Sequence, residues 1–156
     1  MLFALTLFAA LGCGLIAGVF FAFSAFVMKA LARLPPGEGM AAMQSINVAV
    51  LNPWFLGAFL GTAAACVVAL ISSLLRWNQP GAVYLALGAV LYLAGGLLVT
   101  MVCNVPRNEA LARLARADPQ GASRWAGYVA SWTAWNHVRT AASLAAAAAF
   151  SIALRF

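Results

Sequence analysis

Polar side chains that could bind a ligand occur near the ends of long apolar segments in this sequence. Those with amide, aromatic or cationic groups are Asn47, Asn52, Asn104, Asn108, Trp132, Trp135, Asn136 and Arg139. Amide, guanidinium and indole groups of this kind can line a pocket that is both polar and aromatic. Because three separate segments supply these groups at the same side of the predicted fold, we expect them to line one pocket.

Arg139 is expected to lie inside an apolar layer. Sixteen residues separate it from Arg155 at the far interface, and at about 1.5 Å per residue they span about 24 Å, less than a hydrocarbon core of about 30 Å. A charge at that depth costs about 2–3 kcal/mol or more unless it is paired. Arg139 therefore either reaches back to the interface or faces the interior. If neither Glu38 nor Glu109 lies beside it, an anionic ligand is the expected partner.

The helical phase of the last segment favours the inward orientation. At 100° per residue one stripe contains Trp125, Tyr128, Trp132, Trp135, Asn136, Arg139 and Ser143. Tryptophan and tyrosine alone could form an interfacial belt. However, Asn136 and Arg139 share the stripe and would then point into lipid, so we expect the stripe to line a polar and aromatic pocket.

His137 is the single histidine. It is either a hydrogen-bonded structural or interfacial residue, or a general base, since the pKa of an unperturbed imidazole suits proton abstraction near neutrality. A metal site is not expected, because one histidine and scattered methionines have no ligand spacing unless subunits combine their ligands. Haem is equally unsupported.

Several function classes are not supported by the residues. The sequence has no serine–histidine–acid set, paired carboxylates, phosphate-binding loop or dinucleotide fingerprint, and all three acids lie in connections. Cys13, Cys66 and Cys103 lie far apart in apolar runs without a CxxC, so they are read as small buried hydrophobes. The net charge of +6 lies in the gaps between apolar runs, so nucleic acid is not an expected partner.

The elements that position these residues are membrane helices. The 156 residues are 65% hydrophobic and 8% charged, whereas soluble domains are about 25% charged. We predict a single all-α domain over 1–156, an integral membrane four-helix bundle with short cytoplasmic helices in the first and third connections. The four expected spans cover about 2–28, 53–75, 81–103 and 134–154.

Prolines mark the connections. Pro35 and Pro36 end the first helix, and Asn52-Pro53 provides an N-cap and a first-turn proline for the second span. The segment Asn104–Pro106 is expected to interrupt the third helix. A short polar helix over about Arg107–Ala117 would follow and end at Asp118-Pro119.

The distribution of basic residues predicts the orientation. One side of a four-span bundle would hold Lys29, Arg33, Arg107, Arg113, Arg116, Arg124 and Arg139. The other side would hold only Arg76 and Arg155. By the positive-inside rule both long connections face the cytoplasm and both termini face outward. The expected location is a bacterial inner membrane, with membrane lipid as a partner.

Two small-residue stripes could bring helices close together. Gly14 and Gly18, and again Gly57 and Gly61, have the GxxxG spacing. The pattern fits either packing within the bundle or a homo-oligomer, and the sequence does not choose between them.

Three segments resemble the anthrone oxygenase family. They are Met43-Gln-Ser-Ile-Asn47 through Asn52-Pro53, Asn104-Val-Pro-Arg-Asn108-Glu109, and Trp132-Thr-Ala-Trp135-Asn136-His-Val-Arg139-Thr. The similarity covers essentially the whole chain in the expected order. The combination of Asn-x-Pro-x-Asn with Trp-Asn-x-x-Arg is more specific than either element alone.

The resemblance implies a small membrane enzyme that oxidises an anthrone to an anthraquinone with O2 and needs neither metal nor flavin. The substrate would be a small, flat, apolar aromatic molecule, anthrone-like or quinol-like. In such a reaction His137 would act as the base, Arg139 would stabilise the phenolate, and the asparagines and tryptophans would hold the oxygens and rings. The alternative is a non-catalytic membrane protein that binds lipid or supports a neighbouring complex.

Overall fold

Helices make up nearly all of the computed structural model, which describes residues 2–115 and 120–156 and contains no strand there. Segments labelled η are π-helical. In chain order the elements are α1 (Leu2–Ala22), η1 (Phe23–Val27), α2 (Met28–Leu31), α3 (Pro36–Ala49), α4 (Pro53–Leu75), α5 (Ala82–Val90), η2 (Leu91–Leu98), η3 (Thr100–Asn104), α6 (Val105–Ala112) and α7 (Gly121–Ala153). The predicted all-α class is confirmed.

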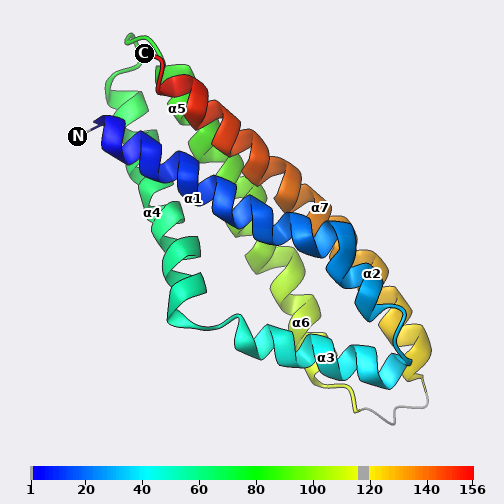
Figure 1. Cartoon of the computed structure of the whole chain (residues 1–156). Coiled ribbons are helices and arrows are strands. Elements are labelled where there is room, and N and C mark those ends of the chain that lie inside the picture. Colours follow the sequence, from blue (N-terminus) through cyan, green and yellow to red (C-terminus); the bar gives the residue numbers. More distant parts are fainter. Residues whose placement is uncertain (1, 116–119) are drawn as a thin grey trace.

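Four long rods run side by side along the molecule (Figure 1). The first rod joins α1, η1 and α2, and the third rod joins α5, η2, η3 and α6. The second and fourth rods are α4 and α7. Helix α3 lies across one end of these rods, where it packs against α6 and α7, and both chain termini lie at the opposite end (Figure 1).

Three of the rods are long and apolar enough to cross a membrane: Leu2–Leu31, Pro53–Leu75 and Ala82–Ala112. These lengths and compositions indicate a membrane protein. Helix α7 is not among the three, because Asn136, His137 and Arg139 lower the hydropathy of the part that would enter the bilayer. The fourth span therefore stays a prediction.

The third rod differs from the sequence prediction. It is not interrupted at Asn104–Pro106 but stays helical to Ala112. The π-helical segment η3 ends directly before Val105 and Pro106, and a wider π turn changes the backbone hydrogen-bond register and can accommodate a residue without an N–H. The separate polar helix predicted over Arg107–Ala117 is thus the end of this rod, and the part of that prediction involving Arg116, Asp118 and Pro119 lies outside the described residues.

The predicted start of the second span is confirmed. The side-chain oxygen of Asn52 accepts hydrogen bonds from the backbone N–H groups of Trp54 at 3.1 Å and Phe55 at 3.0 Å, and Pro53 occupies the first turn. Pro36 likewise begins α3. Both prolines sit where a helical N–H would have no partner.

Buried side chains form two hydrophobic clusters along the bundle. The larger one lies between α1, α4, α5, η2 and α7 and includes Phe20, Phe59, Tyr92 and Phe150. The second lies under α3 and contains Met28, Leu31, Met40, Met43, Leu111, Trp125, Tyr128 and Trp132. The space between these two clusters is where the polar residues gather.

Close helix contacts occur at glycines outside the GxxxG stripes. A Cβ atom added at Gly95 would lie 2.2 Å from the Cβ of Ala142, so the third rod and α7 touch almost backbone to backbone there. By contrast, an added Cβ at any of the four stripe glycines (Gly14, Gly18, Gly57 and Gly61) would meet nothing within 4 Å. The stripes therefore do not pack the described chain internally, and the homo-oligomer stays a prediction.

Replacing Gly95 with alanine should destabilise the protein, because the methyl group must displace a side chain that has no rotamer to change. Overpacking of this kind costs about 1–3 kcal/mol. Gly61→Ala is the matched control, since it gains helix propensity of about 1 kcal/mol without a clash. Thermal unfolding in detergent should give a lower Tm for Gly95→Ala and an unchanged or higher Tm for Gly61→Ala. Equal Tm values for the two variants would contradict the packing described here.

Candidate functional site

Arg139 of α7 lies in the interior with 5% of its surface exposed. Its Nη1 donates to the Thr100 hydroxyl at 3.2 Å, and its Nη2 donates to the side-chain oxygen of Asn136 at 2.7 Å. The guanidinium carbon lies 4.2 Å from the centre of the Phe20 ring and 5.0 Å from that of Trp132, so both rings contribute cation–π attraction. The charge is therefore fixed in place by neutral groups.

Asn136 is the residue that orients this arginine. While its oxygen accepts from Arg139, its Nδ2 donates to the Phe20 carbonyl and to the Ser24 hydroxyl, both at 2.7 Å. Thr140 extends the network through a 3.2 Å contact with Ser24. One amide thus ties α7 to the first rod and positions the cation.

The π-helical segments lie next to this network. Phe20 lies three residues before η1, in the last turn of α1, and a change from α to π register leaves a carbonyl of that turn available for a side-chain donor. In the third rod, Thr100 and Asn104 are the first and last residues of η3. Both contact α7, Thr100 through Arg139 and Asn104 through the Trp132 carbonyl at 3.2 Å.

A second polar cluster lies nearer α3. The side-chain oxygen of Asn108 accepts from the Tyr128 hydroxyl at 3.0 Å and from the Trp132 indole N–H at 2.8 Å. Burial raises the pKa of the Tyr128 phenol, so the hydroxyl stays protonated and able to donate. Gln44 of α3 donates to the carbonyls of Leu111 and Leu114 at 2.8 and 3.1 Å. These bonds give partners to backbone carbonyls at the C-terminal end of α6.

Several buried polar atoms in this region have no hydrogen-bond partner. They are Nε of Arg139, Oδ1 of Asn104 and Nδ2 of Asn47. Asn104 is only 1% exposed. Buried polar groups are nearly always paired, and an unpaired one costs about 1–3 kcal/mol. Two donors and one acceptor without partners around one space indicate a place for a polar ligand group.

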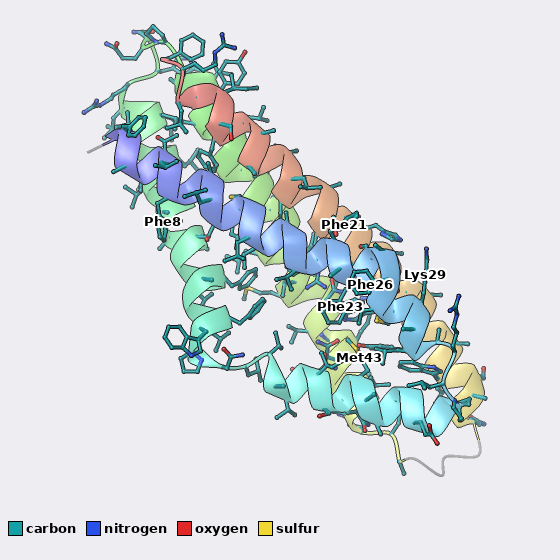
Figure 2. All side chains as sticks on the ribbon, in the orientation of Figure 1. Phe8, Phe21, Phe23, Phe26, Lys29 and Met43 are labelled. Atoms are coloured by element: carbon teal, nitrogen blue, oxygen red, sulfur yellow. The ribbon has the colours of Figure 1, made fainter. Side chains whose placement is uncertain are left out.

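The residues that carry these atoms line a cavity of about 590 Å³ between the two hydrophobic clusters. Its walls come from α1, η1, α3, α4, the third rod and α7. Phe23 of η1 and Met43 of α3 lie across from each other in this region (Figure 2). Most of the surface is apolar, with Arg139, Thr100 and Asn104 as a polar patch. A cavity of this kind suits an apolar molecule with a few oxygens.

The structure brings together five of the predicted site residues. Asn47, Asn104, Asn108, Trp132 and Arg139 all line the cavity. Asn136 lies behind the lining and acts through Arg139, and Asn52 caps α4. His137 and Trp135 are exposed and do not line it; the Trp135 ring packs beside the Arg107 guanidinium instead. The inward stripe of α7 is buried except at Trp135.

Sequence reasoning missed Phe20, Phe23, Ser24, Met43 and Thr100. The aromatic and methionine residues lie in apolar runs and carry no signal that separates them from lipid-facing neighbours. Thr100 could have been found, because it lies one turn before Asn104 on the predicted helix. Ser24 is a polar residue in an apolar span, which is itself an indication of an interior position.

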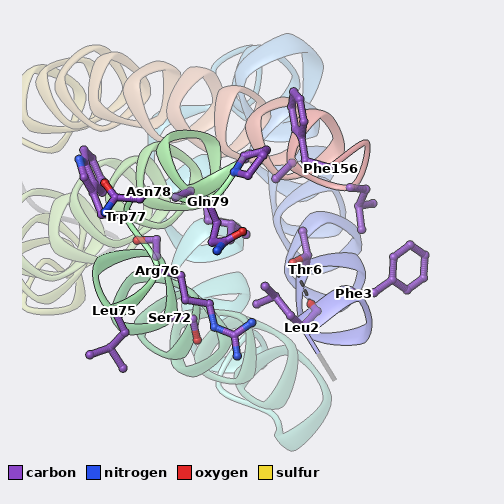
Figure 3. Close-up of a pocket in the computed structure, with 17 residues that line it drawn as sticks. Leu2, Phe3, Thr6, Ser72, Leu75, Arg76, Trp77, Asn78, Gln79 and Phe156 are labelled. Carbon is purple, nitrogen blue, oxygen red and sulfur yellow. Dashed lines mark hydrogen bonds between the residues drawn. The ribbon is translucent and has the colours of Figure 1, made fainter.

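A second hollow of about 670 Å³ lies at the end of the bundle that holds the termini (Figure 3). Its charged and amide side chains, Arg76, Asn78 and Gln79, belong to the exposed α4–α5 connection. No buried charged side chain is among the described residues that line this hollow, whereas the buried Arg139 lines the cavity near α3. Within residues 2–115 and 120–156, no group of three His, Cys, Asp or Glu side chains could hold a metal ion.

The family model for anthrone oxygenase matches residues 51–149. The chain belongs to the anthrone oxygenase family. The match runs from the start of α4 through most of α7 and includes four of the cavity residues named above, Asn104, Asn108, Trp132 and Arg139. No curated protein and no solved structure matches the chain.

Replacing Asn136 with alanine should destabilise the protein, because the Phe20 carbonyl, the Ser24 hydroxyl and one arm of Arg139 lose their shared partner. Leaving buried groups unpaired costs about 1–3 kcal/mol. His137→Ala is the control, as it changes the adjacent but exposed residue. Thermal unfolding should separate the two variants, with only Asn136→Ala losing stability. A similar loss in both would mean that this part of α7 depends on something other than the Asn136 network.

Proposed function

We propose that this chain is a membrane-embedded oxygenase that oxidises a flat aromatic substrate, anthrone-like or quinol-like, with O2 and without a metal or flavin. The observation that carries the proposal is the buried Arg139 guanidinium, which has only neutral hydrogen-bond partners among the described residues and faces an apolar cavity. A ligand with an ionised oxygen supplies the missing negative charge. Family membership supports the same reaction class.

The unpartnered atoms suggest how such a substrate is held. The oxygen that becomes anionic lies at Arg139 Nε, where it accepts a charge-assisted hydrogen bond. Asn47 Nδ2 provides a second donor, and Asn104 Oδ1 accepts from a ring hydroxyl. The fused rings lie among the apolar side chains of the wall, where Trp132 and Phe23, whose ring centres lie 5.5 Å apart in direct contact, offer aromatic surface.

The chemistry needs an ionised substrate more than a cofactor. Removal of a methylene proton from an anthrone gives a carbanion whose charge is delocalised onto the carbonyl oxygen as a phenolate. This anion passes an electron to O2, and the two radicals combine into a peroxide. Loss of water from the protonated peroxide breaks the O–O bond and leaves the second carbonyl. One oxygen atom enters the quinone and the other leaves as water. Stabilising the phenolate is the contribution of Arg139.

The proton acceptor is assigned to Glu109. It is the one carboxylate among the described residues that lines the cavity, and it is also exposed, so it can pass the proton to water. The sequence suggested His137 for this role. That histidine is exposed and outside the cavity lining, which places it away from a ring bound against Arg139.

The membrane arrangement is also part of the proposal. Helix α7 would be the fourth span, because its Arg139 turns into the bundle rather than toward lipid. The cavity end would face the cytoplasm of a bacterial inner membrane with both termini outside, since Lys29, Arg33, Arg107 and Arg113 lie at that end. The open volume beside the polar cluster favours an enzyme over a purely structural role, for which a filled cluster would be sufficient.

Replacing Arg139 with methionine should abolish most activity without unfolding the protein. The variant loses the phenolate-stabilising charge, and loss of such a group typically reduces kcat about 100-fold or more. Stability should change little, because the lost hydrogen bonds are offset by removal of a buried charge. Purified protein treated with chelator is given an anthrone and O2, and quinone absorbance is followed together with Tm.

Arg139→Lys is the companion variant, since it keeps the charge but not the planar fork, and it should retain part of the activity. Wild-type turnover in Arg139→Met would exclude the arginine from the reaction. Activity lost on chelation and restored by copper or iron would exclude a cofactor-free route.

Glu109 and His137 can be distinguished by their pH profiles. Glu109→Gln should lower the rate at neutral pH and recover at high pH, where hydroxide replaces the missing base. His137→Ala should retain the wild-type profile. The reverse result would return the role of base to His137, and no effect of either change would assign proton removal to solvent alone.

A further inference from the structure

One part of the cavity wall is both apolar and exposed. Val48 and Leu51, at the corner between α3 and α4, are 75% and 67% exposed, and Leu60 of α4 is 52% exposed. On the opposite side, Met101 of η3 is 60% exposed and Val105 of α6 is 39% exposed. Because these residues line the cavity and also reach the outer surface, the cavity opens between α4 and the third rod. We call these five residues the lateral opening.

The backbone explains why an opening exists there. Helix α4 and the third rod lie close where α5 and η2 pack on it, but they diverge toward α3 (Figure 1). The connection from α3 to α4 turns at Leu51 and Asn52, so the chain goes around the gap rather than across it. Asn47, Asn104 and Arg139, whose side chains carry the unpartnered atoms, line the cavity between these elements.

The depth of the opening places it against lipid. Trp54, the second residue of α4, is 88% exposed, as expected for a tryptophan at the membrane interface. Leu60 lies six residues further along α4, which is about 9 Å deeper along the axis of an upright helix. This part of the opening therefore faces hydrocarbon.

The lateral opening and the interior of the cavity differ in polarity. All five residues of the lateral opening are apolar, whereas the polar groups without partners, on Arg139, Asn104 and Asn47, lie within. A molecule that enters from the bilayer keeps its apolar parts in an apolar medium throughout and gains hydrogen bonds only at the end of the path. An apolar chain attached to the ring could remain in the lipid while the ring occupies the cavity.

We infer that the cavity takes its ligand directly from the bilayer through the lateral opening, and that the ligand is a flat hydroxyaromatic molecule or aromatic ketone that carries an apolar chain. The identity of the ring system rests on the proposed function. The route and the tolerance for a chain rest on the exposed apolar rim and its depth.

The test compares two blocked openings with two controls. Met101→Trp and Leu60→Trp narrow the opening. Val102→Trp and Val67→Trp place the same ring at exposed positions of the same rods that do not line the cavity. Each protein is reconstituted in phosphatidylcholine vesicles, and association of 1,8-dihydroxyanthraquinone, with and without a dodecyl chain at the ring edge, is followed by the visible fluorescence of the probe.

In the unsubstituted protein, association should follow the mole fraction of probe in the lipid, so doubling the lipid at constant probe should halve the rate. The dodecyl probe should bind at least as tightly as the parent probe. The blocked variants should bind about 10-fold more slowly, because entry then requires a side-chain rearrangement. The controls should stay within about twofold of the unsubstituted protein.

Association rates that are unchanged in Met101→Trp and Leu60→Trp would overturn the inference, as would exclusion of the dodecyl probe. Binding by this route without oxidation of an anthrone would reject the oxygenase and leave the inference intact. Oxidation of an anthrone at an unchanged rate in Met101→Trp and Leu60→Trp would reject the inference and leave the oxygenase intact. Absence of any binding would reject both.

Discussion

The guanidinium of Arg139 is the group on which the organisation of the cavity end depends. A buried cation without a carboxylate partner is unfavourable in an apolar layer, so the surrounding chain must compensate for it. Thr100 and Asn136 provide hydrogen bonds, and Phe20 and Trp132 provide ring faces. These groups come from the first rod, the third rod and α7, so holding one charge requires three rods to meet. The Nε atom of Arg139 has no hydrogen-bond partner, and we propose that an oxygen of the ligand takes that place.

The π-helical segments of the rods also help to hold the charge of Arg139. The first and third rods change to π register beside the cavity, and each change brings a polar group to α7 that regular apolar packing would not supply. About one turn from Arg139, on the side of the termini, the third rod and α7 approach closely through the small residues Gly95 and Ala142. Toward α3 the third rod and α4 diverge, and the cavity opens between them. We propose that this opening lets a bilayer-dissolved molecule reach Arg139.

The sequence predicted much of this arrangement, because hydropathy and helical phase respond directly to the apolar solvent. Three spans, the Asn52-Pro53 helix start and the buried face of α7 all follow from such patterns. The continuity of the third rod through Pro106 did not follow, since a proline signals a break unless a π turn precedes it. Five predicted site residues line the cavity, but His137 does not. It lies two residues from Arg139, and on a helix residues at that spacing point to different faces. Phe20 and Met43 could not be identified, since nothing local marks an apolar residue as facing a cavity.

The central claim is that Arg139 binds an ionised oxygen of an aromatic ligand. The most direct test is the absorption spectrum of a bound hydroxyanthraquinone as a function of pH, because the phenol and phenolate forms differ in colour. A nearby fixed cation lowers the pKa of a phenol. The phenol pKa of the dye should therefore be lower on the unsubstituted protein than in protein-free vesicles, and Arg139→Met should remove that decrease while the dye still binds. An equal phenol pKa on the unsubstituted protein and on Arg139→Met would contradict the account.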